Sequence, residues 1–208
     1  MQLVVISHTE FFYNEATILN QLFSAGMAYC HIRKPLGTEQ ELRQLLDGIE
    51  PAYVTRIALH QHHQLANEYG IKRLHFMEHH RLATTGDTLN QLQKQGYALS
   101  TSVHNIQMAR QLSPVFSYAF FGPVFNAISK EDYHAIVGED FYWPNEQKAV
   151  PMIALGGVDP TTIGRVAAMN FDGAAVLGAL WKNITKGGSL SPDGEWLTLF
   201  KTLHRLCQ

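Results

Sequence analysis

The chain has 208 residues, of which 46% are hydrophobic, 16% are charged and 11 are histidine. This length and apolar fraction are sufficient for one sizeable hydrophobic core, as in an ordinary α/β domain. The formal net charge of −2 excludes the strong basic excess that is typical of proteins that bind nucleic acids or anionic membrane surfaces. We therefore expect neither a nucleic-acid partner nor a membrane partner.

Two cysteines, Cys30 and Cys207, are too few for a disulfide framework and favour a reducing compartment. Cys30 lies in an apolar run, so we expect a buried thiol, whereas Cys207 is next to the C-terminus and is expected to be exposed. The N-terminal segment MQLVVISHTE has no basic stretch, and its apolar run is too short for a signal peptide or a membrane span. These features predict a cytoplasmic protein.

Short β-branched runs alternate with longer segments of helical period along the chain. We expect strands at residues 3–7, 29–33, 56–60, 73–77, 97–103, 118–125, 150–157 and 173–179. We expect helices at 14–26, 39–49, 64–70, 87–96, 105–112, 159–170 and 195–206, a loop directly after 73–77, and irregular structure over 126–149. Asn14 and Gly26 are expected to cap the first helix, and Thr38 and Glu41 have the spacing of a capping box at the second.

Strands that alternate with helical segments imply parallel β-α units. Eight such units are the number in a (β/α)8 TIM barrel, and 208 residues lie at the short end of the range for that fold. A doubly wound open sheet is the alternative, but it usually has fewer strands and a glycine-rich first turn. The first turn here, SHTEFFYN, has no glycine. We predict a single-domain α/β TIM barrel over residues 1–208.

Barrel enzymes have their active sites at the carboxyl ends of the strands. Here this rule selects a basic, histidine-rich group, because the stretches LHQHHQLA and LHFMEHHR hold six of the 11 histidines. The selected residues are His31, Arg33, Lys34, His60, Gln61, His62, His75, Glu78, His79, His80, Ser100, Ser102, His104, Gly122, Ser129, Lys130, Gly156, Gly157 and Gly178. We therefore expect an anionic ligand, namely a phosphorylated small molecule.

Gly156 and Gly157 end the seventh predicted strand and allow the backbone to approach an anion closely. Together with the small-residue turn at Gly178 they match the two loops with which barrels often bind phosphate, the alternative being a tight turn without a ligand. Arg33 and Lys34 are candidates for a clamp on a diphosphate or carboxylate. The alternative for this pair is a solvated basic turn.

The segment NAISKEDYH after the sixth strand is long for a connector, which is typical of a mobile active-site flap that carries Lys130. An ordinary surface lysine is the alternative. Ser102 and His104 lie two residues apart at the end of a strand and face the same way. Because the chain has no Gly-x-Ser-x-Gly motif, this pair does not indicate hydrolase chemistry.

The histidine-rich stretches also allow a metal interpretation. His60, His62 and His80 are candidate Zn²⁺ ligands because imidazole suits that ion. Their spacing matches no common zinc motif, and no cysteine or aspartate joins them. A polar surface is the favoured interpretation for His62, His63 and His79.

Three stretches, FFGPVFNAISK, VPMIALGGV and GAAVLGAL, resemble thiamin phosphate synthases and their TenI-type relatives. The likeness extends from LVVIS near the N-terminus to the eighth predicted strand. The resemblance implies a TIM barrel and a transferase of thiamine biosynthesis. Such an enzyme joins hydroxymethylpyrimidine diphosphate to thiazole phosphate with loss of diphosphate, and it uses Mg²⁺.

The resemblance also implies roles for individual residues. It places thiazole-phosphate binding at Ser129, Gly156, Gly157, Gly178 and Ala179. It places catalytic roles at Arg33, Ser102 and Lys130, to which we add His104 as a candidate base. It places binding of the diphosphate and the pyrimidine at His31, Lys34, His60, Gln61, His75 and His80.

The sequence departs from the family where the metal is expected. Gln61 and His80 stand where the family has its two Mg²⁺-binding aspartates, and amide and imidazole groups are poor ligands for this hard ion. We expect an altered Mg²⁺ site, in which Glu78 supplies a carboxylate or an imidazolium at His60 or His80 replaces the cation. His31 and His60 stand where the family has Gln and Asn.

Three functions remain as alternatives. The transferase with a modified activation site is the leading prediction, because Pro123 and Lys130 match the synthases. A TenI-type thiazole tautomerase fits the missing aspartates and would use His104 or His75 as its base. A non-catalytic binder of thiazole phosphate is the third alternative. The sequence leaves the oligomeric state open, a homo-oligomer included.

Overall fold

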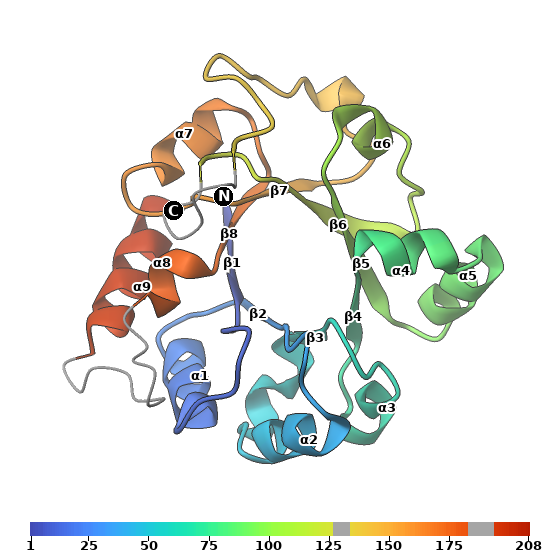
Figure 1. Cartoon of the computed structure of the whole chain (residues 1–208), viewed down its shortest axis with the longest axis vertical. Coiled ribbons are helices and arrows are strands. Elements are labelled where there is room, and N and C mark those ends of the chain that lie inside the picture. Colours follow the sequence, from blue (N-terminus) through green and yellow to red (C-terminus); the bar gives the residue numbers. More distant parts are fainter. Residues whose placement is uncertain (127–133, 183–193) are drawn as a thin grey trace.

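A computed structural model describes residues 1–126, 134–182 and 194–208. Eight parallel strands pair in chain order, and β1 pairs with β8 to close the barrel (Figure 1). The strands are β1 (Gln2–Ile6), β2 (Tyr29–Ile32), β3 (Ile57–Leu59), β4 (Arg73–Phe76), β5 (Ala98–Val103), β6 (Phe116–Phe121), β7 (Met152–Leu155) and β8 (Gly173–Val176). Closure of the sheet confirms the predicted TIM barrel and excludes the doubly wound open sheet.

Helices surround the barrel on its outer side (Figure 1). They are α1 (Glu15–Ser24), α2 (Glu39–Asp47), α3 (Leu65–Tyr69), α4 (Glu78–Ala83), α5 (Gly86–Lys94), α6 (Ile106–Arg110), α7 (Ile163–Ala168), α8 (Gly178–Trp181) and α9 (Glu195–Leu206), with 3₁₀ turns at Pro51–Arg56 and Asn145–Gln147. The prediction of a loop directly after β4 is wrong, because α4 begins at Glu78. The segment contains few apolar residues and therefore lacks the periodic pattern from which a helix is predicted.

The predicted capping residues differ in how they act. Thr38 and Glu41 form the capping box, since the Thr38 hydroxyl accepts from the Glu41 N–H and the Glu41 carboxylate accepts from the Thr38 N–H. Asn14 occupies the N-cap of α1 with φ 63°, but its side chain makes no capping hydrogen bond. Gly26 follows the C-cap residue of α1 with φ 103°, a left-handed conformation that favours glycine.

Alternation of side chains along the strands produces two apolar cores. The larger core lies between the strands and the helices and contains Val5, Leu59 and Phe121. The smaller core lies inside the barrel and consists of Val4, Ile6, Tyr118, Phe120, Ile153 and Ala175. On the side of β2–β5 the carboxyl half of this interior carries polar side chains, which position the candidate site.

The C-terminal helix α9 packs on the barrel beside the N-terminus. The Met1 ammonium donates to the carbonyl of Cys207 at 2.8 Å, and the Cys207 side chain is buried. The prediction of an exposed Cys207 is therefore wrong, because the end of the chain lies against the barrel. Cys30 is buried as predicted. Within the described ranges, the helices are too short or too polar to span a bilayer.

Candidate active site at the carboxyl ends of the strands

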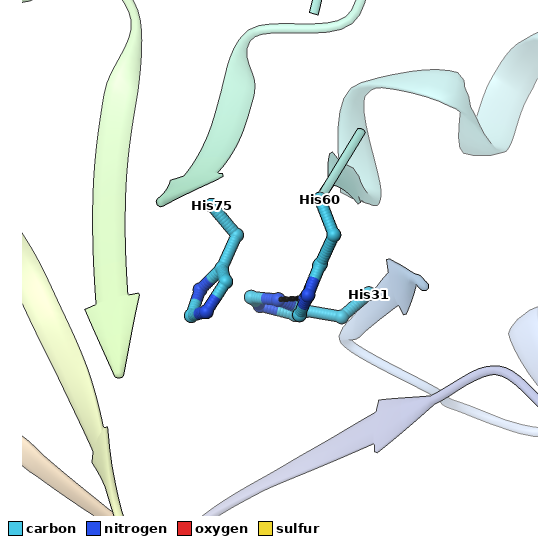
Figure 2. A group of neighbouring side chains, drawn as sticks. All are labelled: His31, His60 and His75. Atoms are coloured by element: carbon cyan, nitrogen blue, oxygen red, sulfur yellow. Dashed lines mark hydrogen bonds between the residues drawn. The ribbon is translucent and has the colours of Figure 1, made fainter. Parts of the chain in front are cut away.

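Three histidines meet inside the barrel, at the carboxyl ends of β2, β3 and β4 (Figure 2). His31 lies on β2, His60 directly follows β3, and His75 lies on β4. The rings of His60 and His75 stack with centroids 4.0 Å apart, and Nδ1 of His31 lies 2.9 Å from Nε2 of His60. We call these three side chains the histidine cluster. The side chains of the cluster are buried.

Hydroxyl groups from β5 and β6 hold two of the three rings. The Tyr118 hydroxyl lies 2.6 Å from Nε2 of His31. The hydroxyls of Ser100 and Ser102, which share one face of β5, lie 2.9 Å from Nδ1 and Nε2 of His75. The third ring differs, because Nδ1 of His60 is buried and has no hydrogen-bond partner among the described residues.

Burial keeps the histidine cluster uncharged. Desolvation lowers the pKa of His31 from 6.5 to about 3. It also lowers the pKa of His60 and of His75 well below 6.5, and neighbouring imidazoles and the positive charge of Arg33 lower both further. Desolvation and then His79 lower the pKa of His80 as well. The direction of these shifts does not favour the imidazolium expected at His60 or His80, which stays a prediction.

The two positions of the family's Mg²⁺ aspartates lie outside the histidine cluster. The Gln61 side-chain oxygen accepts the backbone N–H of Lys34 at 2.9 Å, and its Nε2 is buried without a partner among the described residues. His80 is exposed on α4, with its ring 4.0 Å from that of His79. Glu78 pairs with Arg81 on the same helix. An occupied amide oxygen and an imidazole do not fit Mg²⁺, which prefers carboxylate and water oxygens.

Lys34 belongs to a different part of the structure from the histidine cluster. Its ammonium lies 2.6 and 2.7 Å from the carboxylate oxygens of Glu15, and it also donates to the carbonyls of His8 and Glu10 at 2.9 Å. Both side chains are almost fully buried. Desolvation raises the pKa of Glu15 to about 7 against the lowering effect of Lys34. Lys34 therefore anchors the segment between β1 and α1.

Arg33 and His104 lie at the rim. The Arg33 guanidinium and Nε2 of His104 have no hydrogen-bond partner among the described residues. The backbone N–H of Arg33 donates to Ser7 at 3.0 Å, while its guanidinium has no hydrogen bond or ion pair in the described ranges. Nδ1 of His104 donates to the carbonyl of Gly122, so in the neutral ring Nε2 carries the lone pair. The Arg33 guanidinium can therefore bind an anion, and Nε2 of His104 can accept a proton.

The glycines after β7 pack against the segment that follows β6. Gly156 and Gly157 have φ 97° and 63°, and a Cβ atom on Gly157 would lie 2.6 Å from the Asn126 carbonyl oxygen. A Cβ atom on Gly156 would lie 2.7 Å from Pro123. The glycines are thus required by backbone packing, whether or not they also bind phosphate. Their positive φ angles are not those of an extended strand, so β7 ends at Leu155, before the predicted boundary.

Gly178 and Ala179 begin the four-residue helix α8, directly beyond β8. Their backbone N–H groups are the first of a helix and have no intrahelical acceptor. Ser129 and Lys130, the predicted flap residues, lie outside the described residues. Ser102 is half-buried beside His75, whereas Lys34, His80 and Glu78 do not join the histidine cluster.

The remaining histidines show where sequence reasoning failed. Nε2 of His63 lies 3.0 Å from the Leu59 carbonyl and 3.2 Å from that of His75, so its predicted surface location is wrong. His62 is half-buried with φ 53°, and its Nε2 lies 2.9 Å from the Gly37 carbonyl. His79 is exposed as predicted. Within the described residues, His62 and His80 do not converge with His60, and His31 and His75 do.

Two partners of the site were not expected from the sequence, namely Tyr118, which contacts His31, and Glu15, which pairs with Lys34. Ser100 was among the residues selected at the strand ends, and its hydroxyl lies beside His75. Glu15 carried no signal, since it lies in the first turn of a helix where acidic residues are common.

The fold and the rim define a parallel-barrel protein with polar groups gathered at the carboxyl ends of its strands. A family model described as thiamine monophosphate synthase matches residues 3–180. The chain belongs to this family.

Individual relatives match more weakly than the family does. Thiamine-phosphate synthases of Anoxybacillus flavithermus and Pasteurella multocida are both 33% identical, over 85 and 86 residues, respectively. Each match covers 39% of this chain and 39% of the relative. A solved thiamine phosphate pyrophosphorylase from Bacteroides thetaiotaomicron has a TM-score of 0.76 at 23% identity, covering 99% of this chain and 97% of that one. At this identity the likeness shows the fold alone.

Proposed function

We propose that the chain is a transferase that joins hydroxymethylpyrimidine diphosphate to thiazole phosphate with release of diphosphate. The observation that carries the proposal is the presence of two separate groups of anion-compatible donors at one rim. The first group contains the Arg33 guanidinium and Nε2 of Gln61, beyond β2 and β3. The second contains the backbone N–H groups after β7 and at the start of α8. The transferase needs one site for the diphosphate and another for the thiazole phosphate, and the two groups of donors would provide them.

In this proposal the first group receives the diphosphate. Arg33 offers the paired donors that suit phosphate oxygens, and its charge stabilises the negative charge that develops as the diphosphate departs. Gln61 supplies a donor that has no acceptor in the described part of the chain, so a phosphate oxygen would satisfy it. Lys130 is proposed to contact the diphosphate, and Ser129 the thiazole phosphate.

The histidine cluster is proposed to face the pyrimidine. Departure of diphosphate leaves positive charge on the pyrimidine, and the imidazoles of a cluster without a bound ion do not repel it. The low pKa of His31, which results first from burial, keeps that ring neutral. Because the residues at the aspartate positions do not fit Mg²⁺, Arg33 and the flap carry the stabilisation of the leaving group here.

A single-turnover assay tests this function. The protein is mixed with both substrates, with and without Mg²⁺, and thiamin phosphate is measured. We expect product in both conditions and loss of most activity in Arg33→Ala. The Arg43→Ala variant is the matched control, because Arg43 lies on the outer helix α2. Absence of product in both conditions would contradict the transferase.

The thiazole tautomerase is the second candidate, and one observation favours it. Nδ1 of His104 donates to the Gly122 carbonyl, which leaves Nε2 as a proton acceptor at the rim. Exchange of solvent deuterium into the thiazole carboxylate, lost in His104→Gln, would support this function. We expect either reaction to take place in the cytoplasm, because Cys30 and Cys207 are both free thiols.

A further inference from the structure

We propose that His31, His60 and His75 bind a first-row transition-metal ion of the Zn²⁺ class inside the barrel. One ligand nitrogen from each ring lies within 4.8 Å of the other two, and the three side chains converge from β2, the end of β3 and β4 (Figure 2). In a tetrahedral Zn²⁺ site with bonds of about 2.0–2.1 Å, the ligand nitrogens are roughly 3.4 Å apart. Nδ1 of His31 and Nε2 of His60, at 2.9 Å, would move apart by about 0.5 Å to reach that geometry.

A hydrogen bond marks where the ion would lie within the cluster. Nδ1 of His31 and Nε2 of His60 lie 2.9 Å apart and share one proton, so one of them donates and the other accepts. An ion bound to these two nitrogens would take the place of that proton. Nδ1 of His60 has no partner among the described residues and would not be a ligand in this arrangement.

The surroundings of the cluster resemble the outer shell of a metal site. A histidine that binds a metal through one nitrogen usually has its other nitrogen held by an oxygen atom. The Tyr118 hydroxyl holds His31 in this way at 2.6 Å, and the Ser100 hydroxyl holds His75 at 2.9 Å. A bound ion would replace the proton between His31 and His60 and the contact between His75 and Ser102.

The chemistry of the ligands selects the ion. Three uncharged imidazoles suit Zn²⁺, Co²⁺, Ni²⁺ and Cu²⁺, whereas Mg²⁺ and Ca²⁺ require oxygen ligands. Three protein ligands leave the fourth position of a tetrahedral ion open, as in catalytic zinc sites. The two positive charges of the ion are not balanced by the cluster itself. The open position would therefore take an anionic oxygen ligand.

This site is separate from the rim positions Gln61 and His80, and it does not rest on the proposed transferase function. It uses His31 and His60, two positions at which this chain departs from its family. Binding of the ion is measured directly, so failure of the metal site and failure of the transferase are distinguishable.

Metal binding to the full chain tests the proposal. Protein freed of metal with a chelator is titrated with Zn²⁺ against a chromophoric competitor, and with Co²⁺ by visible absorption. We expect one ion per chain, a Co²⁺ spectrum of a four- or five-coordinate site, and no competition from Mg²⁺ in excess. His60→Asn is expected to weaken Zn²⁺ binding by more than about 100-fold, beyond the 10–100-fold typical of outer-shell changes.

Two further variants keep the test independent of folding. The double variant H31Q/H60N restores the family's residue types and should lose the Co²⁺ spectrum while it keeps the circular dichroism of a folded barrel. His79→Ala, an exposed histidine on α4, should bind Zn²⁺ like the unaltered chain. Substoichiometric Zn²⁺, or equal affinity in H31Q/H60N and the unaltered chain, would overturn the proposal.

Discussion

The two halves of the barrel rim are built on opposite principles. Around β2–β5 the site consists of polar side chains that bond to one another, namely the histidine cluster, Ser100 and Ser102, together with Tyr118 from β6. Beyond the ends of β6 and β7 it consists of positions without side chains, where Gly156 and Gly157 allow two backbone segments to pack. The first half depends on protonation and hydrogen bonding, and the second on steric fit.

The contrast explains why the family resemblance is uneven across the rim. A glycine turn that fits against a neighbouring segment tolerates no larger residue, so it is preserved by packing alone. A polar cluster can be exchanged for another if every group finds a partner. By the family resemblance, imidazoles stand at several positions of β2–β4 where amide or carboxylate groups are expected. We therefore expect the ions and charges that the site can hold to differ on this side.

The largest expected effect is that the histidine cluster lowers the stability of the protein at acid pH. His31 has a folded pKa of about 3 and an unfolded pKa near 6.5, so between these values the unfolded chain binds more protons. The free energy of unfolding therefore falls as the pH falls below 6.5. His60 and His75 shift in the same direction. Together the three contribute a slope of up to about 4 kcal/mol per pH unit.

Urea denaturation in chelator at several pH values between 7.5 and 5 measures this slope. In H31Q/H60N two of the three groups are absent, so the slope should fall by about 2.7 kcal/mol per pH unit. Glu15, whose pKa is raised to about 7, contributes with the opposite sign in both proteins and cancels in the difference. Equal slopes in the two proteins would show that the cluster is not buried in its uncharged form.

Lys34→Met is expected to have the next largest effect, on stability rather than on ligand binding. It leaves the Glu15 carboxyl buried without its partner, at a cost of about 3–5 kcal/mol. The double variant Lys34→Met/Glu15→Leu should recover most of that loss. Arg43→Met removes partly exposed ion pairs and should cost no more than about 1 kcal/mol. If the Lys34→Met variant has normal stability but binds diphosphate more weakly, Lys34 has the diphosphate-binding role that the sequence predicts.

Gly157→Ala tests the steric side of the comparison. The new Cβ atom would meet the Asn126 oxygen at 2.6 Å with φ at 63°, so we expect a loss of roughly 2–4 kcal/mol from overlap and backbone strain. Gly164→Ala on α7 meets nothing within 4 Å and should be neutral or stabilising by up to about 1 kcal/mol. Thermal unfolding of both variants measures the difference. A Gly157→Ala protein as stable as Gly164→Ala would mean that the turn can relax.

The same comparison shows what the sequence can predict. Strand number, barrel closure and the Thr38 capping box follow from local patterns, because periodicity and capping act over a few residues. The histidine cluster does not follow from local patterns, because a pattern along one strand cannot show which residues of other strands it meets. It could not show that His60 is joined by His31 and His75, whereas His62 and His80 lie elsewhere. Pairing of Lys34 with Glu15 was hidden for the same reason. Its partner is 19 residues away, on a helix that packs outside the barrel.

The smallest expected effects separate two hydroxyls on one strand. Ser100 and Ser102 contact the two nitrogens of His75, but Ser100 is buried and Ser102 is half-buried. Ser100→Ala leaves a buried nitrogen unpaired and should cost about 1–3 kcal/mol, whereas water can replace the hydroxyl in Ser102→Ala at little cost. Chemical denaturation of the two variants measures this.

Ligand binding then decides what Ser102 does. If Ser102 contacts the pyrimidine diphosphate, as the family resemblance implies, Ser102→Ala should weaken binding of that substrate several-fold while stability changes by less than about 0.5 kcal/mol. If Ser102 only orients His75, Ser102→Thr, which keeps a hydroxyl, should restore binding fully. Unchanged binding in Ser102→Ala would remove Ser102 from the site. The functional part of the histidine side would then consist of its imidazoles and Arg33.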